Sequence, residues 1–382
     1  MANYDYEIVN GRKIRVRPKE TVSEIDKNGY FRRQPNHFTT PFGDGENDLK
    51  AEGNKRYRLV WAKLCHWSNR AAIVRELEGL EDQISVNMVE HAPHEKNLGW
   101  EYVYNENNID PVLGDQFLSE AYYRADDYYQ GRTTVPALID TTTGKVVNND
   151  YNWLTTYFEV NFRPWHKKGA PELYPVELRE EIDKMNLWLF DNINNAVYRS
   201  SFSRSNEGHF DGVNTFYAAM DRLEKRLETN RFIFGDYVTD SDIRLYVTLA
   251  RLDIRYTTQL GETKRPLYTY KNLWGYAKEL WEIPAFAHHT DFAAIIRQGR
   301  IEGEEDGFRA STHYDLALPK IDWDAQWKVS TERAYLSSDP THPIYLGNNR
   351  RFDIDPTWYD LGAESPKKEE KETPPSCGCC CG

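Results

Sequence analysis

The chain has 382 residues, of which 40% are hydrophobic and 14% aromatic. This length exceeds what one hydrophobic core usually organises, and the composition excludes a disordered chain, so we expect two packed domains with extensions. The formal net charge of −12, with no run of lysine and arginine to offset it, argues against a nucleic-acid partner.

The first segment, residues 1–51, carries turn-forming pairs such as Asn10-Gly11 and Asn28-Gly29, which predict an extended arm rather than a domain. The first 20 residues lack the apolar stretch of a secretory signal. Nowhere does the chain approach the roughly 18 consecutive apolar residues that a membrane span needs. We therefore expect a cytoplasmic protein with no membrane span.

Residues 52–162 alternate between strand-like and helix-like patterns. The order β-α-β-α-β-β-α is that of a thioredoxin-like domain. The predicted elements are a strand over 57–64, a helix over 71–79, a strand over 84–89, a helix over 117–125, a hairpin over 135–148 and a helix from about Asp150.

Residues 176–298 show helical periodicity, with apolar residues at steps of three or four over 178–197 and again over 213–227. Thr239 and Asp242 then form a capping-box pattern before a largely apolar stretch, which indicates a buried helix. We therefore predict an α/β domain followed by an all-α helical domain.

The other segments have no regular pattern. Residues 163–175 are rich in proline, glycine and lysine, which is typical of a linker. Residues 299–362 combine Trp, Tyr, Asp and Pro without periodicity, so we expect an irregular extension that drapes over the core. Residues 363–382 mix Pro, Glu and Lys before a run of cysteines and are predicted to be disordered.

Cys65 is the one cysteine in the body of the chain, because the other four crowd into the last six residues: Cys377, Cys379, Cys380 and Cys381. This distribution excludes a disulfide framework for the fold. Cys65 lies between the first predicted strand and the first predicted helix, where backbone N–H groups stabilise a thiolate. A lone buried cysteine can also serve merely as a small apolar residue.

The cysteine-rich tail leaves several roles open. Clustered thiolates select soft cations such as Cu(I) or Zn(II), and such cysteines can also carry palmitate. A tail thiol could reach Cys65 and resolve an adduct there. As a prenylation signal the tail is poor, because its middle positions are not aliphatic and glycine is last. The remaining alternative is a tail without a specific function.

A series of short motifs lies between about residues 28 and 295: Leu64-Cys65-His66-Trp67 with Arg70, Gly99-Trp100-Glu101, Val135-Pro136, Asn148-Asn149, Leu173-Tyr174-Pro175, Asn194 to Tyr198, Asp242 to Leu245 and Asn272 to Tyr276. In combination they resemble the Xi class of glutathione transferases, the glutathionyl-hydroquinone reductases. The resemblance implies an enzyme that uses glutathione as cosubstrate, acts on an aromatic or quinol small molecule, requires no metal in the fold and forms a homodimer.

In that family a cysteine attacks the sulfur of a glutathionyl-hydroquinone and forms a mixed disulfide that a second glutathione resolves. The resemblance gives this role to Cys65, and to Tyr198 a hydrogen bond to the quinol oxygen. Because Ser68 stands where a C-x-x-C motif has its second cysteine, an external thiol must resolve the adduct. The positions implied for binding glutathione are Trp100, Arg132, Val135 before a cis Pro136, Asp150 and Tyr151.

The sequence departs from the family pattern at three places. His66 replaces a proline; it either stabilises the thiolate as a cation or points to solvent. Tyr151 replaces a small hydroxyl residue that grips the γ-glutamyl carboxylate, which makes another low-molecular-weight thiol an alternative cosubstrate. The family's His-Tyr-Tyr after the last bundle helix is absent, which leaves open a non-catalytic binding protein on this fold. Further candidate modulators of the site are Trp67, Tyr256 and Tyr314.

Overall fold

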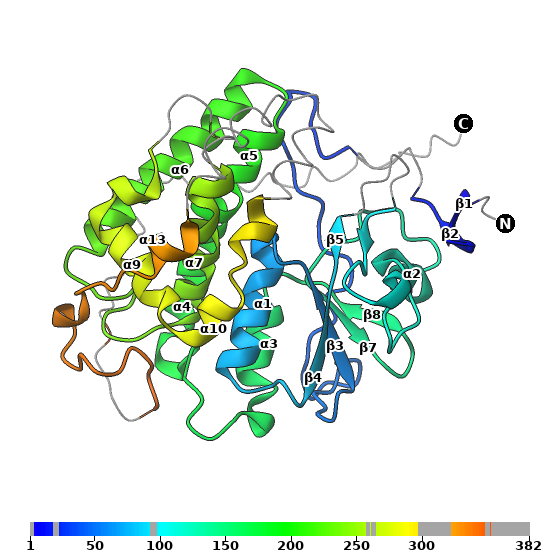
Figure 1. Cartoon of the computed structure of the whole chain (residues 1–382), viewed down its shortest axis with the longest axis horizontal. Coiled ribbons are helices and arrows are strands. Elements are labelled where there is room, and N and C mark those ends of the chain that lie inside the picture. Colours follow the sequence, from blue (N-terminus) through cyan, green and yellow to red (C-terminus); the bar gives the residue numbers. More distant parts are fainter. Residues whose placement is uncertain are drawn as a thin grey trace, which may run out of the picture.

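The computed structural model describes residues 4–17, 23–91, 98–256, 260, 265–296, 322–347 and 352. A small sheet with helices on both faces makes up one side of the molecule, and a group of long helices makes up the other (Figure 1). The two parts meet along helices α1 (His66–Leu77) and α3 (Leu154–Val160), which lie between the sheet and the helical group.

The sheet has four strands in the order β4-β3-β7-β8. The central pair β3 and β4 is parallel, as a crossover through helix α1 requires, and the other neighbours are antiparallel. Helix α2 (Leu118–Ala125) covers the face opposite α1 and α3 (Figure 1). This arrangement confirms the predicted thioredoxin-like fold. The strand bounds are β3 Tyr57–Trp61, β4 Ile84–Met88, β7 Ala137–Asp140 and β8 Lys145–Asn148.

Strand β3 is buried along its whole length. Successive side chains of a strand point to opposite faces, so Leu59 packs into the cluster that includes α1 while Val60 packs into the cluster that includes α2. Helix α1 ends at Leu77, and Gly79 follows it with a φ of +73°, the left-handed conformation predicted for the end of this helix. Strand β3 is central in the sheet, and the chain continues from its end to Cys65.

The helical part contains a run of helices after residue 175, which confirms the predicted all-α domain: α4 Arg179–Leu189, α5 Ala196–Phe202, α6 Asn206–Arg226, α7 Asp240–Arg251, α9 Lys271–Trp281 and α10 Pro284–His288. The continuous helix expected over 178–197 is interrupted by a π-helical turn, Phe190–Asn194. This wider turn brings Asn194 to α7, where its amide donates to the carbonyl of Arg244 and to the hydroxyl of Thr248.

Shorter elements connect the main ones. A second π-helical turn, Leu252–Tyr256, continues α7. The others are the two-stranded pair β5 Glu90–His91 and β6 Trp100–Glu101, the helix α13 Trp323–Trp327, and 3-10 turns at Glu106–Asn108, Arg163–Trp165, Val176–Leu178, Leu267–Thr269 and Ala334–Leu336.

The N-terminal arm is not extended throughout. Strands β1 (Tyr6–Val9) and β2 (Arg12–Arg15) form a hairpin whose two turn residues, Asn10 and Gly11, both have positive φ. The hairpin lies near α2 (Figure 1), where Arg12 pairs with Glu120 at 3.1 Å. Farther along, the arm contacts the helical part, where the carbonyl of Gly29 accepts a hydrogen bond from the backbone N–H of Arg204 at 2.6 Å.

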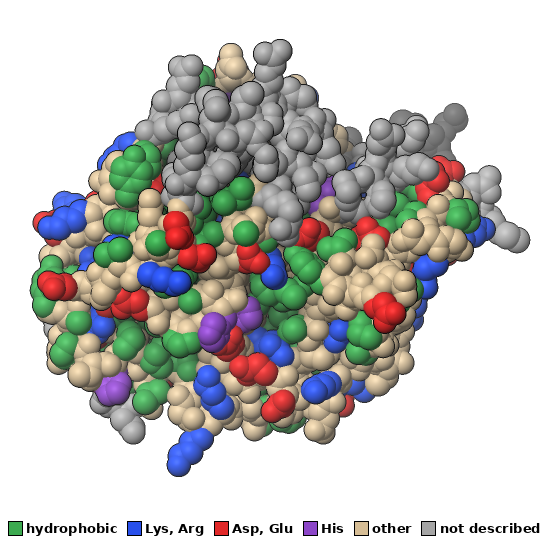
Figure 2. Space-filling model, in the orientation of Figure 1, with side chains coloured by type: hydrophobic (Ala, Val, Ile, Leu, Met, Phe, Trp, Pro, Cys, Tyr) green, Lys and Arg blue, Asp and Glu red, His purple; other side chains and the backbone are tan. Residues whose placement is uncertain are grey.

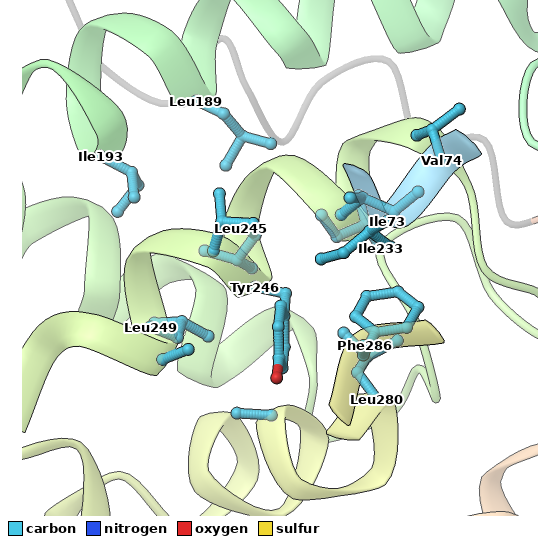
Figure 3. Packing of buried hydrophobic residues seen from close by; sticks show 14 of the residues in the cluster. Ile73, Val74, Leu189, Ile193, Ile233, Leu245, Tyr246, Leu249, Leu280 and Phe286 are labelled. Atoms are coloured by element: carbon cyan, nitrogen blue, oxygen red, sulfur yellow. The ribbon is translucent and has the colours of Figure 1, made fainter. Parts of the chain in front are cut away.

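One hydrophobic cluster spans both parts of the molecule. Ile73 and Val74 of α1 pack in the same cluster as Leu245 and Leu249 of α7 and Phe286 of α10 (Figure 3). Complete burial of each such side chain is worth roughly 1.5–3 kcal/mol. The contact between the two parts is therefore a continuous core, which fixes α1 and its preceding cysteine relative to α7.

The described part of the C-terminal region packs on the helical part. Trp327 of α13 is 2% exposed and lies edge-on to Trp274, with ring centroids 5.1 Å apart. Farther along, the carbonyl of Pro343 accepts a hydrogen bond from the backbone of Val238. Tyr314 and the predicted tail with its four cysteines lie outside the described residues.

Three features of the described residues relate to the predictions about a nucleic-acid partner, a membrane span and a metal site. Acidic and basic side chains are interspersed over the described residues of the face in Figure 2, with no basic patch there. No helix of the described ranges has both the length and the apolar character to cross a bilayer. Within those same ranges, no group of three or more His, Cys, Asp and Glu side chains is arranged to hold a metal ion.

The predicted capping pattern at the start of α7 is confirmed and centres on Asp242. Its carboxylate accepts hydrogen bonds from the backbone N–H and the hydroxyl of Thr239 at 2.8 and 2.9 Å. It also accepts from the N–H of Ile233 and the hydroxyl of Tyr276. Burial raises the pKa of Asp242 to about 6, so the group is an ionised acceptor at neutral pH.

We expect Asp242→Asn to destabilise the protein, because the amide would turn N–H donors toward groups that are themselves donors. The expected loss is about 2 kcal/mol in the free energy of unfolding, measured by urea denaturation at neutral pH. Asp221→Asn, at an exposed ion pair with Arg265, is the control and should change stability by less than about 0.5 kcal/mol. Equal effects of the two substitutions would contradict this account of Asp242.

Candidate active site

Cys65 occupies the N-cap position of α1, directly after the loop that follows β3. Its side chain is 6% exposed, and its sulfur lies 3.8 Å from the carbonyl oxygen of Val135. The peptide bond between Val135 and Pro136 is cis, as predicted. The sulfur therefore lies at a helix N-terminus, close to the backbone that precedes β7.

Arg251, from the last turn of α7, holds the loop before Cys65. Its Nε donates to the carbonyl of Leu64 at 2.7 Å, and one Nη donates to the carbonyl of Lys63 at 2.8 Å. The other Nη donates to Asn69 on α1 at 3.1 Å and to the carbonyl of Val247. Arg251 is fully buried, and no carboxylate of the described residues lies within ion-pair distance of it. Neutral oxygens alone thus solvate a buried positive charge beside Cys65.

A cavity of about 360 Å³ opens at Cys65. Thioredoxin-like, helical and arm residues all contribute to its walls. Of the residues predicted from the sequence, those that line the cavity are Cys65, Trp67, Trp100, Arg132, Val135, Tyr151 and Tyr198. A more open hollow of about 430 Å³ lies elsewhere on the thioredoxin-like domain, around Arg56 and Trp165, and contains none of them.

Four predicted positions lie outside the lining of this cavity: His66, Pro136, Asp150 and Tyr256. Pro136 is buried. Asp150 is 8% exposed, and its Oδ1 accepts hydrogen bonds from the side chain of Asn36 at 2.9 Å and from the backbone of Asn152 at 3.0 Å. One carboxylate oxygen of Asp150 therefore already has partners within the chain.

The cavity wall predicted to contact glutathione combines Trp100 and Arg132. The indole N–H of Trp100 donates to the carbonyl of Thr133 at 3.1 Å. Arg132 makes a two-pronged ion pair with Glu24, with distances of 2.7 and 2.9 Å, and this contact contributes to lowering the pKa of Glu24 against the effect of its burial. The charge of Arg132 is thus balanced by a carboxylate of the N-terminal arm.

The arm contributes cavity residues that were not predicted from the sequence: Glu24, Phe31, Arg33, Gln34 and Asn36. Gln34 and Arg132 exchange two hydrogen bonds of 2.9 Å, and Phe38 and Asn149 are joined in the same way. An aperiodic segment gives no signal of its own for such contacts. The available signal was that the family resemblance begins at about residue 28, inside the arm.

Aromatic rings form another part of the cavity lining. The ring of Trp67 lies 4.8 Å from that of Tyr151 and 5.8 Å from that of Tyr198, between ring centroids. Tyr151 also stacks on Phe190, with an interplanar angle of 14°. Burial raises the pKa of Tyr151, so its hydroxyl stays protonated. The tyrosine that replaces a small hydroxyl residue is thus part of an aromatic wall.

His66 is neither a cation beside the sulfur nor a solvent-facing side chain, the two alternatives considered from the sequence. The side chain is 1% exposed and so does not point to solvent. Burial lowers its pKa well below the usual value, and the positive charges of Arg251 and Arg33 lower it further. His66 is therefore neutral in the folded protein at neutral pH and cannot act there as a cation beside the sulfur.

The two ring nitrogens of His66 have different surroundings. Its Nδ1 lies 3.1 Å from the hydroxyl of Thr248 and 3.1 Å from that of Tyr256. Asn194 donates to the same Thr248 oxygen at 2.7 Å. The Nε2 atom is buried and has no hydrogen-bond partner among the described residues. Tyr256 lies in this buried network rather than in the cavity.

Comparisons with known proteins agree with this geometry. The family model for the C-terminal domain of glutathione S-transferases matches residues 197–279. The glutathionyl-hydroquinone reductase YqjG of Escherichia coli is 33% identical over 63% of this chain and 73% of its own length.

Solved structures give the same result. The Xi glutathione S-transferase of Phanerochaete chrysosporium is 33% identical, with a TM-score of 0.64 over 71% of this chain and 87% of that one. The glutathione-bound structure of Escherichia coli YqjG is 32% identical, with a TM-score of 0.61 over 70% and 87% of the two chains. The chain therefore belongs to the Xi class of glutathione transferases, the family of the glutathionyl-hydroquinone reductases, and is an enzyme of that type.

Proposed function

We propose that this enzyme reduces glutathionyl-hydroquinones or related aromatic thioethers with glutathione, through a mixed disulfide on Cys65. The observation that supports this most directly is the position of the sulfur, at the N-terminus of α1 and on the wall of a cavity that several aromatic rings line. Glutathione as the thiol is supported by the relative from Escherichia coli, whose structure is described as glutathione-bound.

The proposed reaction has two steps. The Cys65 thiolate attacks the glutathionyl sulfur, so an S–S bond forms and the bond from that sulfur to the aromatic carbon breaks. The electron pair stays on the aromatic carbon, which takes up a proton and leaves as the hydroquinone. A second glutathione thiolate then attacks the glutathione sulfur of the mixed disulfide and restores Cys65. Two glutathione sulfurs are oxidised to a disulfide while the aromatic carbon is reduced.

The surroundings of Cys65 favour a thiolate nucleophile. Backbone N–H groups in the first turn of α1 have no partners within the helix, and they carry the positive end of its dipole. Arg251 adds a buried positive charge that no described carboxylate neutralises. A thiolate, not a thiol, is the reactive form of cysteine. These groups are expected to increase the nucleophilicity of Cys65 at neutral pH.

The aromatic wall suits a planar acceptor. Tyr198 and Phe202 come from α5, and their ring centroids lie 5.6 Å apart. Together with Trp67 they present apolar rings to the cavity next to Cys65. Burial of a hydroquinone ring against such rings is favourable, and the hydroxyl of Tyr198 is the group we assign to the quinol oxygen.

The homodimer and the cytoplasmic location stay predictions.

We infer that His66 positions the cysteine turn. Its Nδ1 contacts the hydroxyls of Thr248 and Tyr256, so the neutral ring links the first residue of α1 to the end of α7 and the turn that follows it. A neutral ring in this place fixes the turn without competing with the thiolate for a proton.

Replacement of Cys65 by serine should abolish glutathione-dependent reduction of a glutathionyl-hydroquinone, because the nucleophile is lost. The wild-type comparison uses a protein whose four tail cysteines are serine, so that adducts report on Cys65. Intact-mass and peptide analysis after treatment with glutathione disulfide should find glutathione on Cys65, and added glutathione should remove it. An adduct with another thiol alone would favour that thiol as cosubstrate. An unmodified Cys65, or full turnover by Cys65→Ser, would refute the proposal.

Arg251→Gln should slow alkylation of Cys65 by iodoacetamide at neutral pH and destabilise the protein by about 3 kcal/mol, because buried carbonyls of Lys63 and Leu64 lose their donors. Arg251→Lys keeps the positive charge but lacks the planar guanidinium with its several donors. This variant should recover part of the reactivity that Arg251→Gln loses. The control, Arg265→Gln, alters an exposed ion pair and should leave both measurements nearly unchanged. Wild-type alkylation rates in a folded Arg251→Gln protein would count against this role.

His66→Gln tests the neutral state of the histidine through the pH dependence of stability. The unfolded chain takes up a proton near the usual pKa of about 6.5, whereas the folded chain does so only at lower pH. The wild type should therefore lose stability relative to the variant as pH falls from about 6.5, by up to about 1.4 kcal/mol per pH unit. Urea unfolding at several pH values measures this difference.

His342→Gln is the control for the His66 experiment, because His342 is exposed. Its difference from the wild type should stay constant over the same pH range. A constant difference for His66→Gln as well would mean that His66 takes up its proton in the folded protein near the usual pH.

A further inference from the structure

Arg33 extends from the N-terminal arm into the cavity at Cys65. Its guanidinium carbon lies 4.3 Å from the ring centroid of Tyr198 and 4.6 Å from that of Trp67. The ring of Tyr151 is the next nearest of these, at 5.6 Å. Arg33 thus lies over the aromatic wall. Its neighbours there include Tyr198, which we assign to the acceptor, and Tyr151, which replaces the residue that grips the γ-glutamyl carboxylate in the family.

The hydrogen bonds of Arg33 leave part of the guanidinium unused. Its Nε donates to the side-chain oxygen of Asn195 at 2.9 Å, which fixes the orientation of the planar group. One of its Nη atoms is buried and has no hydrogen-bond partner among the described residues, and none of their carboxylates forms an ion pair with Arg33. Such a desolvated donor is costly unless an acceptor occupies the cavity.

Arg132 shows the contrast within the same cavity. Its guanidinium is already paired in a two-pronged contact with Glu24, whose carboxylate also accepts the backbone N–H of Gln34. A ligand carboxylate would have to displace Glu24 to reach Arg132 in that way. Arg33 has no such competitor among the described residues.

The neighbouring substitutions indicate which ligand group Arg33 meets. At residue 151 the small hydroxyl residue of the family is replaced by a tyrosine whose ring packs on Trp67 and Phe190. One carboxylate oxygen of Asp150 already accepts a hydrogen bond from the side chain of Asn36. The planar fork of an arginine matches the two oxygens of a carboxylate, and the aromatic surface below it strengthens their attraction by excluding water.

We propose that Arg33 binds a carboxylate of the thiol cosubstrate and so makes the site selective for anionic thiols, such as glutathione, over neutral ones. This inference rests on the proposed function, because it requires thiol exchange at Cys65. Arg33 acts as a specificity-determining residue that the arm supplies to a site built mainly by the two folded domains.

The test compares a charged and a neutral disulfide as substrates for mixed-disulfide formation on Cys65. Glutathione disulfide carries carboxylates, whereas 2-hydroxyethyl disulfide carries none. The rate of adduct formation is followed by intact mass in the protein whose tail cysteines are serine. Arg33→Gln should slow the reaction with glutathione disulfide about 10- to 100-fold, the range expected for a lost charge-assisted pair, and change the neutral reaction less than about twofold.

Arg32→Gln is the matched control, since Arg32 pairs with Asp26 and its side chain is 66% exposed. It should leave both rates unchanged, and Arg33→Lys should retain part of the preference for glutathione disulfide. Equal slowing of both reactions by Arg33→Gln would show that Arg33 only organises the aromatic wall. Unchanged rates, or a loss confined to the aromatic acceptor, would also overturn the proposal. If the wild type forms no adduct with either disulfide, the proposed function itself fails.

Discussion

The fixed position of Cys65 depends on the contact that Arg251 makes across the two parts of the molecule. Its guanidinium, at the end of α7, donates to the backbone of Lys63 and Leu64, the two residues before the cysteine. The beginning of the same helix is held by Asp242, whose carboxylate collects four donors. The geometry of a cysteine in the thioredoxin-like domain is thus set by a helix of the other domain. Neither domain alone contains the complete site.

Positive charge gathers at the site although the chain as a whole is acidic, with a formal net charge of −12. Burial is the largest cause of the lowered pKa of His66. The positive charges of Arg251, Arg33, Arg255 and Arg70 lower this pKa further. In a buried environment these charges act at longer range than they would in water. They add to the effect of burial that keeps His66 neutral, and they favour anionic ligands and a thiolate in the cavity.

The order of elements in both domains was predictable because it rests on local patterns, such as the alternation of β4 and the capping pattern of α7. Cys65, Val135 and the cavity rings of Trp67, Trp100, Tyr151 and Tyr198 were also found, through the motifs that carry the family resemblance. The state of His66 was not predictable, because its partners Thr248 and Tyr256 lie 182 and 190 residues away. The arm residues were missed for a similar reason, since an aperiodic segment takes its conformation from the surfaces on which it packs.

The departures from the family pattern become consistent when they are considered together. Tyr151 removes a small hydroxyl but adds a ring that completes the wall formed with Trp67 and Phe190. That wall supports the guanidinium of Arg33, which Asn195 orients from the helical part. The site thus combines a larger ring at residue 151 with a cation held on aromatic rings. In the role proposed for Arg33, charge is the physical basis on which this cavity distinguishes one thiol from another.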